Sequence, residues 1–457
     1  QWDIIIIGGG ATGLGAAVDA ATRGLKTLLL EEQDFAKGTS SRSTKLLHGG
    51  VRYLAQGNYK MVMEALKERG FLLKNAPHVS SNFFFIIPAY KLWEKFYYGI
   101  GLKVYDAMAG SLGLGKTRII SNEAIIQQLP TIQQHKLKGG IVYKDGQFDD
   151  TRLAINLAQT AVENDACILN YCRVTSLIKE DKKIKRVVLT DSISRKEYQV
   201  KAAVVINATG VFTDSILRMD DAAKPALVSP SQGVHIVLDK KFFPGNDAMM
   251  IPQTTDGRVL FAVPWHNKVI VGTTDTPVKK ISIEPAALQE EVQFILNNIN
   301  AYLDTTITKK DILSVFAGLR PLVKIKNVFK TSLMPRDHTI VISESGLVSI
   351  TGGKWTTYRK MAKDVVDKAT AVGKFTKTNC ITQSLKIHGW KDYIDKEDPL
   401  HYYGADLPQL KKLYLENESW QTLLHPLFSY TKACVIWAIR NEMALTVEDV
   451  LARRTRM

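Results

Sequence analysis

Apolar residues form two short uninterrupted runs near the start of the chain, with a helical stretch between them. Asp3–Ile7 and Thr27–Glu31 carry β-branched and leucine residues without polar alternation, which predicts strands buried on both faces. Leu14–Arg23 is rich in alanine and favours a helix. Together the three segments predict one βαβ unit. Further buried strands are predicted at Ala202–Ile206 and Leu347–Thr351, the second followed by a helix over about 356–371.

A different pattern, strand after strand, fills the region between residues 226 and 275. Asp256-Gly257 is a hairpin signal between Met249–Gln253 and Val259–Val263, which predicts an antiparallel sheet. The chain after Phe375 is mostly helical. We therefore predict an α/β protein with a discontinuous first domain, an inserted sheet domain and a helical C-terminal domain, at residues 1–80, 145–225 and 335–375; 81–144 and 226–334; and 376–457.

A glycine-rich turn joins the first predicted strand to the first predicted helix. Its pattern is Gly8-x-Gly10-x-x-Gly13, and Glu31 ends the next strand. In this order the glycines permit a tight turn, close approach of a pyrophosphate and close helix packing, while the acid accepts from ribose hydroxyls. The unit predicts a dinucleotide site, with FAD or NAD both open. Two later glycine turns, Asn207–Gly210 and Thr351–Lys354, are candidates to return to the same cofactor.

Composition and charge narrow the function classes. The 457 residues are 45% hydrophobic and 23% charged, an ordinary globular mix, with a net charge of +15. This excess suggests an anionic partner: nucleic acid, an anionic membrane or a phosphorylated or carboxylated substrate. No basic helix with interleaved aromatic residues supports nucleic acid. The four cysteines show no CxxC spacing, which disfavours a metal site and fits a reduced cytosolic protein. No run of 18 apolar residues predicts a membrane span.

Several motifs together resemble the FAD-dependent glycerol-3-phosphate dehydrogenases. They are Ile7–Gly24, Thr39–Ser41, Lys45–Leu54, Gly272–Asp275, Gly318–Leu322 and Gly352–Ala362, with a weaker echo in Ala452–Thr455. Leu14 departs from the small residue usual in the family. The resemblance implies an FAD-binding Rossmann-like domain of the glutathione-reductase/D-amino-acid-oxidase type. It also implies oxidation of sn-glycerol 3-phosphate to dihydroxyacetone phosphate, with hydride transfer to FAD and electrons passed to a membrane quinone.

The residues themselves offer candidates for that chemistry. Alcohol oxidation needs a base, and on a strand His235 points away from the face of Val234 and Ile236. Binding a dianionic phosphate needs cations, and glycine- or proline-flanked turns carry several. We expect catalytic roles for His235, Arg320 and Tyr53, and phosphate contacts from Arg52, Lys354 and Arg336. The expected cofactor contacts are Gly8, Gly10, Gly13, Glu31, Thr39, Ser41, Ser43, Lys45, His48, Val174, Ala208, Gly210, Gly353, Lys354 and Thr356.

The segment Lys91–Val104 is a candidate membrane-surface helix. Leu92, Trp93, Phe96, Tyr97, Ile100 and Val104 lie on one side of it, with Lys91, Lys95 and Lys103 beside them. With a quinone acceptor this predicts a cytoplasmic protein, peripheral on the inner face of the cell membrane, and a homodimer is a further expectation. The alternatives are a glycerol-3-phosphate oxidase that uses O2, and an amino-acid or 2-hydroxy-acid oxidase on the same fold.

Overall fold

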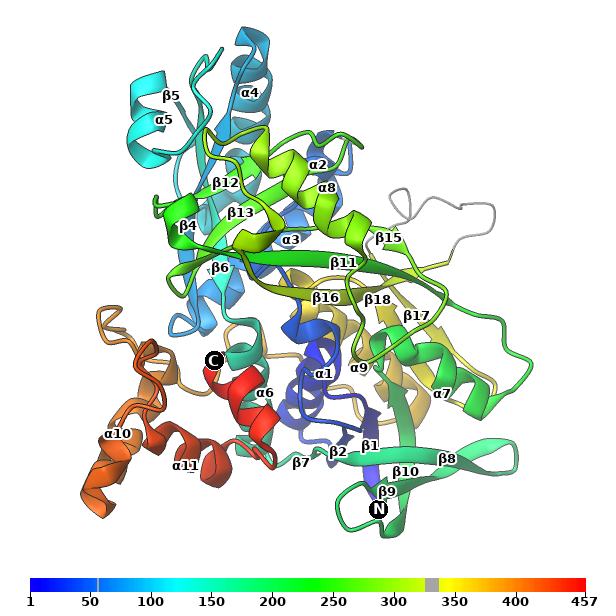
Figure 1. Ribbon diagram of the computed structural model, residues 1–457. Helices are drawn as coiled ribbons and strands as arrows, with labels where there is room; N and C mark the ends of the chain where they lie inside the picture. The colour runs from blue at the N-terminus through cyan, green and yellow to red at the C-terminus, as the bar shows by residue number, and fades with distance from the viewer. Residues whose placement is uncertain (56, 325–336) are drawn as a thin grey trace.

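Two sheets organise the computed structural model (Figure 1), which describes residues 1–55, 57–324 and 337–457, with only the backbone of residues 52 and 55. In the first sheet β1 lies at the centre, parallel to its neighbours β10 and β2. The strand order is β17 (His338–Ile342), β18 (Val348–Gly352), β10 (Glu197–Asn207), β1 (Trp2–Ile7), β2 (Thr27–Leu30) and β7 (Cys167–Leu169).

Both faces of this sheet are covered, which explains the unbroken apolar run of β1. Ile4 and Ile6 pack with the helices on one face, whereas Ile5 and Ile7 pack with the other layer. The first layer consists of α1 (Ala11–Thr22), α6 (Asp150–Glu163) and α9 (Tyr358–Gly373). The second layer consists of α7 (Thr213–Asp220) and the ribbon β8 (Cys172–Glu180) and β9 (Lys183–Asp191).

The second sheet is larger and mostly antiparallel. Its order is β15 (Thr276–Pro277), β11 (Val228–Asp239), β14 (Lys268–Gly272), β13 (Leu260–Trp265), β12 (Ala248–Ile251), β4 (Ser80–Pro88), β6 (Gly140–Phe148) and β3 (Leu46–Leu47), with β16 (Ile312–Val323) on β11 and β5 (Arg118–Ile120) on β6. One face packs on α8 (Gln289–Asn300) and α5 (Asn122–Gln128). The other packs on α3 (Tyr59–Asn75) and α4 (Leu92–Ala109), beside the short α2 (Val51–Ala55).

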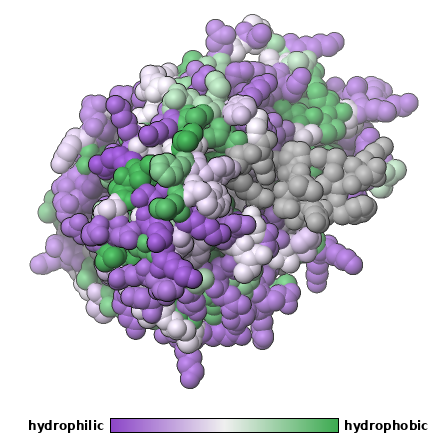
Figure 2. Space-filling view, turned by 90° about the horizontal axis from the view of Figure 1, so that it is seen from above, coloured by the Kyte–Doolittle hydropathy of each residue, from purple (hydrophilic) through white to green (hydrophobic). Residues whose placement is uncertain are grey.

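Helix α4 stands at one end of the molecule with most of its apolar residues outward. Seen from above, that end exposes hydrophobic side chains surrounded by hydrophilic ones (Figure 2). Leu102 and Tyr105 anchor the helix against the sheet. The side chains predicted to share one side are all exposed, by 44–64%: Leu92, Trp93, Phe96, Tyr97, Ile100 and Val104. Among the described residues, no helix is long and apolar enough to cross a bilayer.

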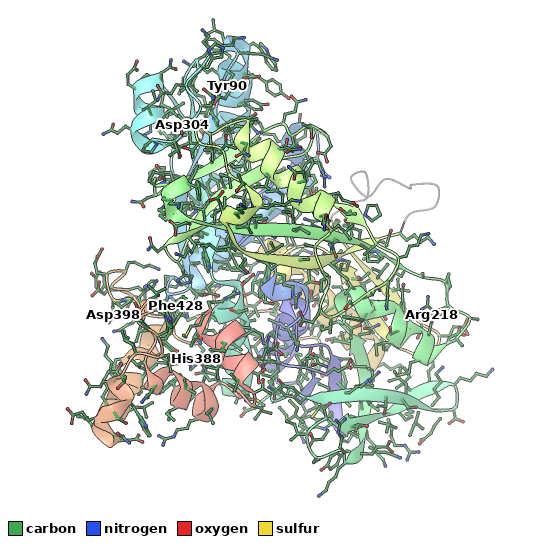
Figure 3. All side chains as sticks on the ribbon, in the orientation of Figure 1. Tyr90, Arg218, Asp304, His388, Asp398 and Phe428 are labelled. Atoms are coloured by element: carbon green, nitrogen blue, oxygen red, sulfur yellow. The ribbon has the colours of Figure 1, made fainter. Side chains whose placement is uncertain are left out.

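The C-terminal region contains α10 (Leu407–Glu416), α11 (Lys432–Asn441) and a final helical turn over Asp449–Thr455. It packs beside α1 and α6, and His388 and Phe428 lie in it, far from Tyr90 at the other end (Figure 3). Tyr402 and Tyr403 join it to the core of the first sheet. The fold class predicted from the sequence, with a helical last domain, is confirmed.

The predicted elements form, with shifts at their ends. The first helix begins at Ala11, three residues earlier than predicted, and α9 begins at Tyr358 after a 3₁₀ turn over Trp355–Thr357. The hairpin of β12 and β13 pairs Met250 with Phe261. Strand β3 belongs to the second sheet, although it falls within residues 1–80, which were predicted to form part of the first domain. The sequence did not predict this strand, because two residues are too few to produce a periodic pattern.

Candidate active site

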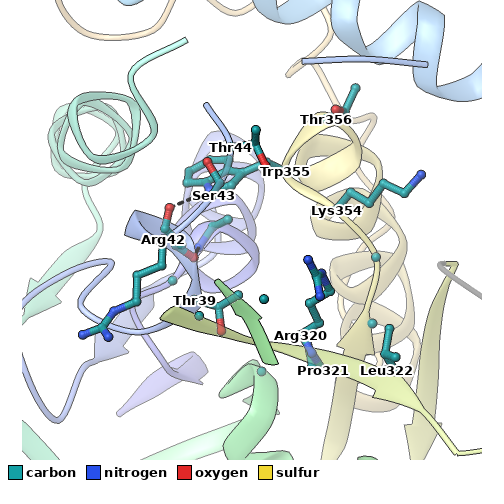
Figure 4. Close-up of a pocket in the computed structure, with 18 of the residues that line it drawn as sticks. Thr39, Arg42, Ser43, Thr44, Arg320, Pro321, Leu322, Lys354, Trp355 and Thr356 are labelled. Atoms are coloured by element: carbon teal, nitrogen blue, oxygen red, sulfur yellow. Dashed lines mark hydrogen bonds between the residues drawn. The ribbon is translucent and has the colours of Figure 1, made fainter. Parts of the chain in front are cut away.

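A cavity of about 1240 Å³ lies between the two sheets (Figure 4). This exceeds the 300–1000 Å³ of common ligand pockets, and leaves room for a dinucleotide together with a small substrate. Of the expected residues, fifteen line it: Gly8, Gly10, Glu31, Thr39, Ser43, His48, Tyr53, Val174, Ala208, Gly210, His235, Arg320, Gly353, Lys354 and Thr356. Arg336 and the side chain of Arg52 lie outside the described residues.

The turn between β1 and α1 is built for a close approach of backbone and ligand. Gly8 has a φ of +110°, and a Cβ at Gly13 would lie 1.8 Å from the Gly8 carbonyl oxygen. Gly13 therefore packs the helix against the turn, rather than lining the cavity. The amide of Ala11, at the helix N-terminus, donates to Ser40 Oγ at 2.9 Å. Such a terminus supplies amide donors and positive potential for a diphosphate.

Glu31 braces the same turn. Its carboxylate accepts from the backbone amide of Gly9 at 2.6 Å and from that of Gln33 at 2.8 Å. Burial raises the pKa of this carboxyl, although both amide bonds favour the charged form. Each oxygen keeps a lone pair, so the group can also accept from a ribose hydroxyl.

Two expected cofactor contacts face away from the cavity. Lys45 Nζ lies 2.6 Å from the Asp150 carboxylate and donates to the Ser41 carbonyl at 2.7 Å. Burial lowers the pKa of Lys45 to about 8. The hydroxyl of Ser41 is directed at the Gly38 carbonyl. Their neighbours Ser40 and Thr44 line the cavity instead. The sequence could not predict which side chains of this loop face the cavity, because an irregular loop has no repeating side-chain period.

A cationic group forms one wall of the cavity. Arg320 projects from β16, and its guanidinium donates to the Thr273 hydroxyl and the Thr274 carbonyl, both at 3.0 Å. Asp275 lies 3.5 Å from it. Lys354 Nζ lies 4.0 Å from the centroid of the Tyr53 ring. The arrangement brings an arginine, a lysine and a phenol to one cavity, and the two cations suit a small phosphate ester.

His235 occupies the face predicted by strand alternation. Val234 and Ile236 pack in the core under α8, whereas the His235 ring lines the cavity. Its Nε2 lies 2.9 Å from Thr44 Oγ1, and the ring stacks on Phe316 at 4.7 Å between centroids. Burial, together with the nearby cations Arg320 and Lys45, lowers the pKa of His235 well below its usual value. The imidazole is therefore neutral at pH 7.

His48 is a second neutral imidazole in the cavity. Burial and the charge of Lys354 lower its pKa to about 3. Its ring lies 6.3 Å from that of Phe261. It can contact a ring system through its face or by a hydrogen bond, but it carries no charge there.

These observations fit a bound FAD. Gly8, Gly10 and the start of α1 would hold the diphosphate, and Glu31 the ribose. The wall with His48, His235 and Arg320 would face the reacting end, and the Gly353–Thr356 turn lines the same cavity. FAD, when bound, supplies the acceptor for a hydride equivalent.

Comparison with known proteins agrees with this site. Residues 3–359 match the family described as FAD dependent oxidoreductase, so the chain belongs to that class of flavoproteins. Residues 348–457 match the C-terminal domain of alpha-glycerophosphate oxidase. The solved structure of glycerol-3-phosphate dehydrogenase from Bacillus halodurans, complexed with FAD, superposes with a TM-score of 0.81 at 30% identity, covering 100% of this chain and 86% of that one.

Curated relatives identify the member of the class. The mitochondrial glycerol-3-phosphate dehydrogenase of Mesocricetus auratus is 41% identical over 492 residues, covering 100% of this chain and 67% of that protein. The human mitochondrial enzyme is 40% identical with the same coverage. The chain belongs to the FAD-dependent glycerol-3-phosphate dehydrogenases. The predicted family, activity and cofactor are thereby confirmed, and the amino-acid and hydroxy-acid oxidase alternative falls away.

Proposed function

We propose that this dehydrogenase takes its substrate at the cationic wall of the cavity and delivers the electrons to a quinone from an anionic membrane. The observation that supports the proposal is that α4 is exposed on the outer surface and also lines the cavity. Tyr97 and Ile100 are exposed on the outer apolar face, by 56% and 64%, and also line the cavity together with Tyr98. The helix therefore forms part of the rim through which the cavity opens.

The substrate end follows from charge. Arg320 and Lys354 bind the phosphate dianion, with Arg52 and Arg336 as further candidates. The neutral imidazole of His235 takes the hydroxyl proton, and Tyr53 orients the substrate. A dianion beside Arg320 offsets one of the charges that lower the pKa of His235. Substrate binding thus makes the imidazole a stronger base at the moment when it must accept a proton.

The acceptor end follows from polarity. Leu54, Tyr98, Val259 and Phe261 line the cavity and pack with the apolar cluster that holds α4 against the sheet. A quinone head group is flat and weakly polar and suits such walls, and its prenyl tail would extend toward lipid. Tyr97 and Ile100 at the rim leave this end open to a membrane-bound acceptor.

Membrane attachment is a separate part of the proposal. Trp93 and Phe96 are 57% and 62% exposed, the exposed Lys103 lies on the same helix, and the exposed Lys91 directly precedes it. Burying each aromatic side chain in lipid contributes roughly 1.5–3 kcal/mol, and each lysine near an anionic surface about 1 kcal/mol. Location on the cytoplasmic side of a cell membrane, and a homodimer, stay predictions.

The test compares two variants on vesicles of phosphatidylglycerol that contain quinone. Trp93→Asp with Phe96→Asp should abolish sedimentation with vesicles and slow reduction of the embedded quinone, while a water-soluble dye is reduced as in wild type. Leu415→Asp is the control, because Leu415 is 88% exposed on α10, in the C-terminal region. Equal vesicle binding by both variants would exclude α4 as the membrane contact.

A second assay addresses the O2 alternative, which the match to the alpha-glycerophosphate oxidase domain keeps in view. With glycerol 3-phosphate in air, an oxidase forms one hydrogen peroxide per substrate oxidised. We expect little peroxide and fast quinone reduction. Stoichiometric peroxide at a rate above that of quinone reduction would overturn the proposed acceptor.

A further inference from the structure

The buried carboxylate of Asp150 accepts hydrogen bonds from the Ser43–Lys45 loop, which lies beside His235. Asp150 is fully buried at the start of α6. It accepts from the hydroxyl of Ser43 and from Lys45 Nζ, both at 2.6 Å, and from the Ser43 amide at 3.3 Å. Ser43 Oγ in turn accepts from the Lys45 amide at 3.0 Å. The residues on either side of Thr44 are therefore both held by one carboxylate.

Thr44, held between Ser43 and Lys45, connects this loop to the His235 ring in the cavity. Its hydroxyl lies 2.9 Å from Nε2 of His235. Phe316 stacks on one face of the imidazole, and Lys45 Nζ lies 5.7 Å from the centroid of that phenyl ring. The position of the His235 ring thus depends on Thr44, which the Asp150 cluster holds in place, and on Phe316, which pairs with His235 across β11 and β16.

The second cation on Asp150 comes from the end of the chain. The guanidinium of Arg456 bonds to Asp150 and, at 3.1 Å, to Asp149. Figure 1 places this C-terminal segment beside α6. The segment is anchored there, since Arg453 and Arg454 both bond to the buried Asp34.

Charge explains why an arginine is needed at this place. Asp149 and Asp150 are adjacent buried carboxylates, and Lys45 and Arg456 are the cations bonded to them in the described part of the chain. The four charges sum to zero. Nη2 of Arg456 contacts both carboxylates, and the planar guanidinium spreads its charge beside them, whereas an ammonium is a single point charge. Without Arg456 the two carboxylates repel each other, and the single positive charge of Lys45, bonded to Asp150, does not balance both.

We propose that Arg456 is a positioning residue of the active site, acting through Asp150 and the Ser43–Lys45 loop on the imidazole of His235. The inference rests on the proposed role of His235 as the base. Arg456 directly follows the C-terminal motif Ala452–Thr455, so the inference also gives a reason why this segment is held beside α6.

The experiment measures flavin reduction by glycerol 3-phosphate, mixed anaerobically with the FAD-loaded full chain. The variants are Arg456→Met, Arg456→Lys, Thr44→Val and the double variant Arg456→Met with Thr44→Val. Arg440→Gln is the control, because Arg440 forms an exposed ion pair with Glu416 in the same C-terminal region. FAD content and melting temperature are recorded for each variant.

We expect Arg456→Met and Thr44→Val each to slow reduction about ten-fold or more, because small displacements of a catalytic group are costly. The substrate concentration at half-maximal rate should change little. Arg456→Lys should recover part of the rate, and the double variant should be no slower than the slower single variant. Multiplied effects in the double variant, or a normal rate in Thr44→Val, would overturn the inference.

Two further outcomes separate the possible failures. If Arg456→Met does not fold, Arg456→Lys takes its place, alone and in a double variant with Thr44→Val. A double variant no slower than the slower single variant then supports the inference, and multiplied effects overturn it. If His235→Ala reduces its flavin at the normal rate, the proposed base is wrong. In that case a slow Arg456→Met variant would show that the C-terminal motif acts elsewhere, and this inference fails as well.

Discussion

Replacing Arg320 with alanine tests the proposed binding of the substrate phosphate. The guanidinium is preorganised by Thr273, Thr274 and Asp275 and projects into the cavity. A charge-assisted hydrogen bond to phosphate is worth roughly 1.5–3 kcal/mol, which corresponds to about 13- to 160-fold in affinity. Alanine also leaves Asp275, 5% exposed, without this counter-charge, so the loss should lie at or above the upper value.

The assay follows flavin absorbance after anaerobic mixing with increasing glycerol 3-phosphate, and then with glycerol, which lacks the phosphate. Arg320→Ala should bind FAD normally and lose about 160-fold or more in apparent second-order rate with the phosphate ester. The slow reaction with glycerol should be almost unchanged. Dithionite should bleach both proteins equally, which verifies that the flavin is intact.

Arg42→Gln is the matched control for this variant. Arg42 also lies beside the cavity, but its guanidinium turns away to Glu284 and the Ala317 carbonyl. Its loss should change the rate with glycerol 3-phosphate less than about three-fold, as for an exposed ion pair. If Arg320→Ala slows both substrates by one factor, or keeps the wild-type concentration dependence, Arg320 does not bind the phosphate.

Three other predictions concern the base, the cofactor turn and the C-terminal region. His235→Ala should slow flavin reduction about 100-fold or more with less effect on substrate affinity, and an unchanged limiting rate would exclude the role. Gly13→Ala forces a Cβ against the Gly8 carbonyl and should reduce FAD retention, measured by flavin content, whereas Gly101→Ala, with open space around it, should not. Burial opposes protonation of His388, but its bonds to Asp406 and Glu163 prevail and raise its pKa to about 8. The protonated form therefore stabilises the fold by roughly 1–2 kcal/mol below about pH 6.5, a contribution lost as the pH rises past 8. The melting temperature of wild type should exceed that of His388→Gln by a few degrees at pH 6 and match it near pH 9, and a constant difference would refute the coupling.

The local pattern of hydrophobic and polar residues was sufficient to predict the regular strands and helices and the faces that their side chains occupy. Ile4–Ile7 is buried on both sides because helices and a ribbon cover its sheet, and the run without polar residues indicated this. Alternation in β11 placed His235 on the face opposite Val234, where the cavity lies. The α4 side chains predicted to share one face are all exposed, since helical periodicity fixes a face even when its partner is unknown.

Irregular segments and long-range ion pairs were beyond that reasoning. In the loop after Thr39, Ser41 and Lys45 turn inward while Ser40 and Thr44 line the cavity, and no period distinguishes one from the other. The pairing of Arg456 with Asp150 joins residues 306 positions apart. The sequence showed a family-like motif at Ala452–Thr455, directly before Arg456, but only the packed structure indicates which carboxylates Arg456 bonds.

The arrangement of the cavity bears on how one flavin serves two reactions. Glycerol 3-phosphate is a water-borne dianion and a quinone is confined to lipid, so the two should not compete for one entrance. Cations gather at β16 and the turn after β18, whereas the rim at α4 is apolar and faces outward. If the two ends act separately, the Trp93→Asp, Phe96→Asp variant should keep a normal rate of flavin reduction by substrate. Arg320→Ala should keep a normal rate of oxidation of its dithionite-reduced flavin by quinone. A variant of either end that slowed both half-reactions equally would mean that substrate and acceptor share a single site.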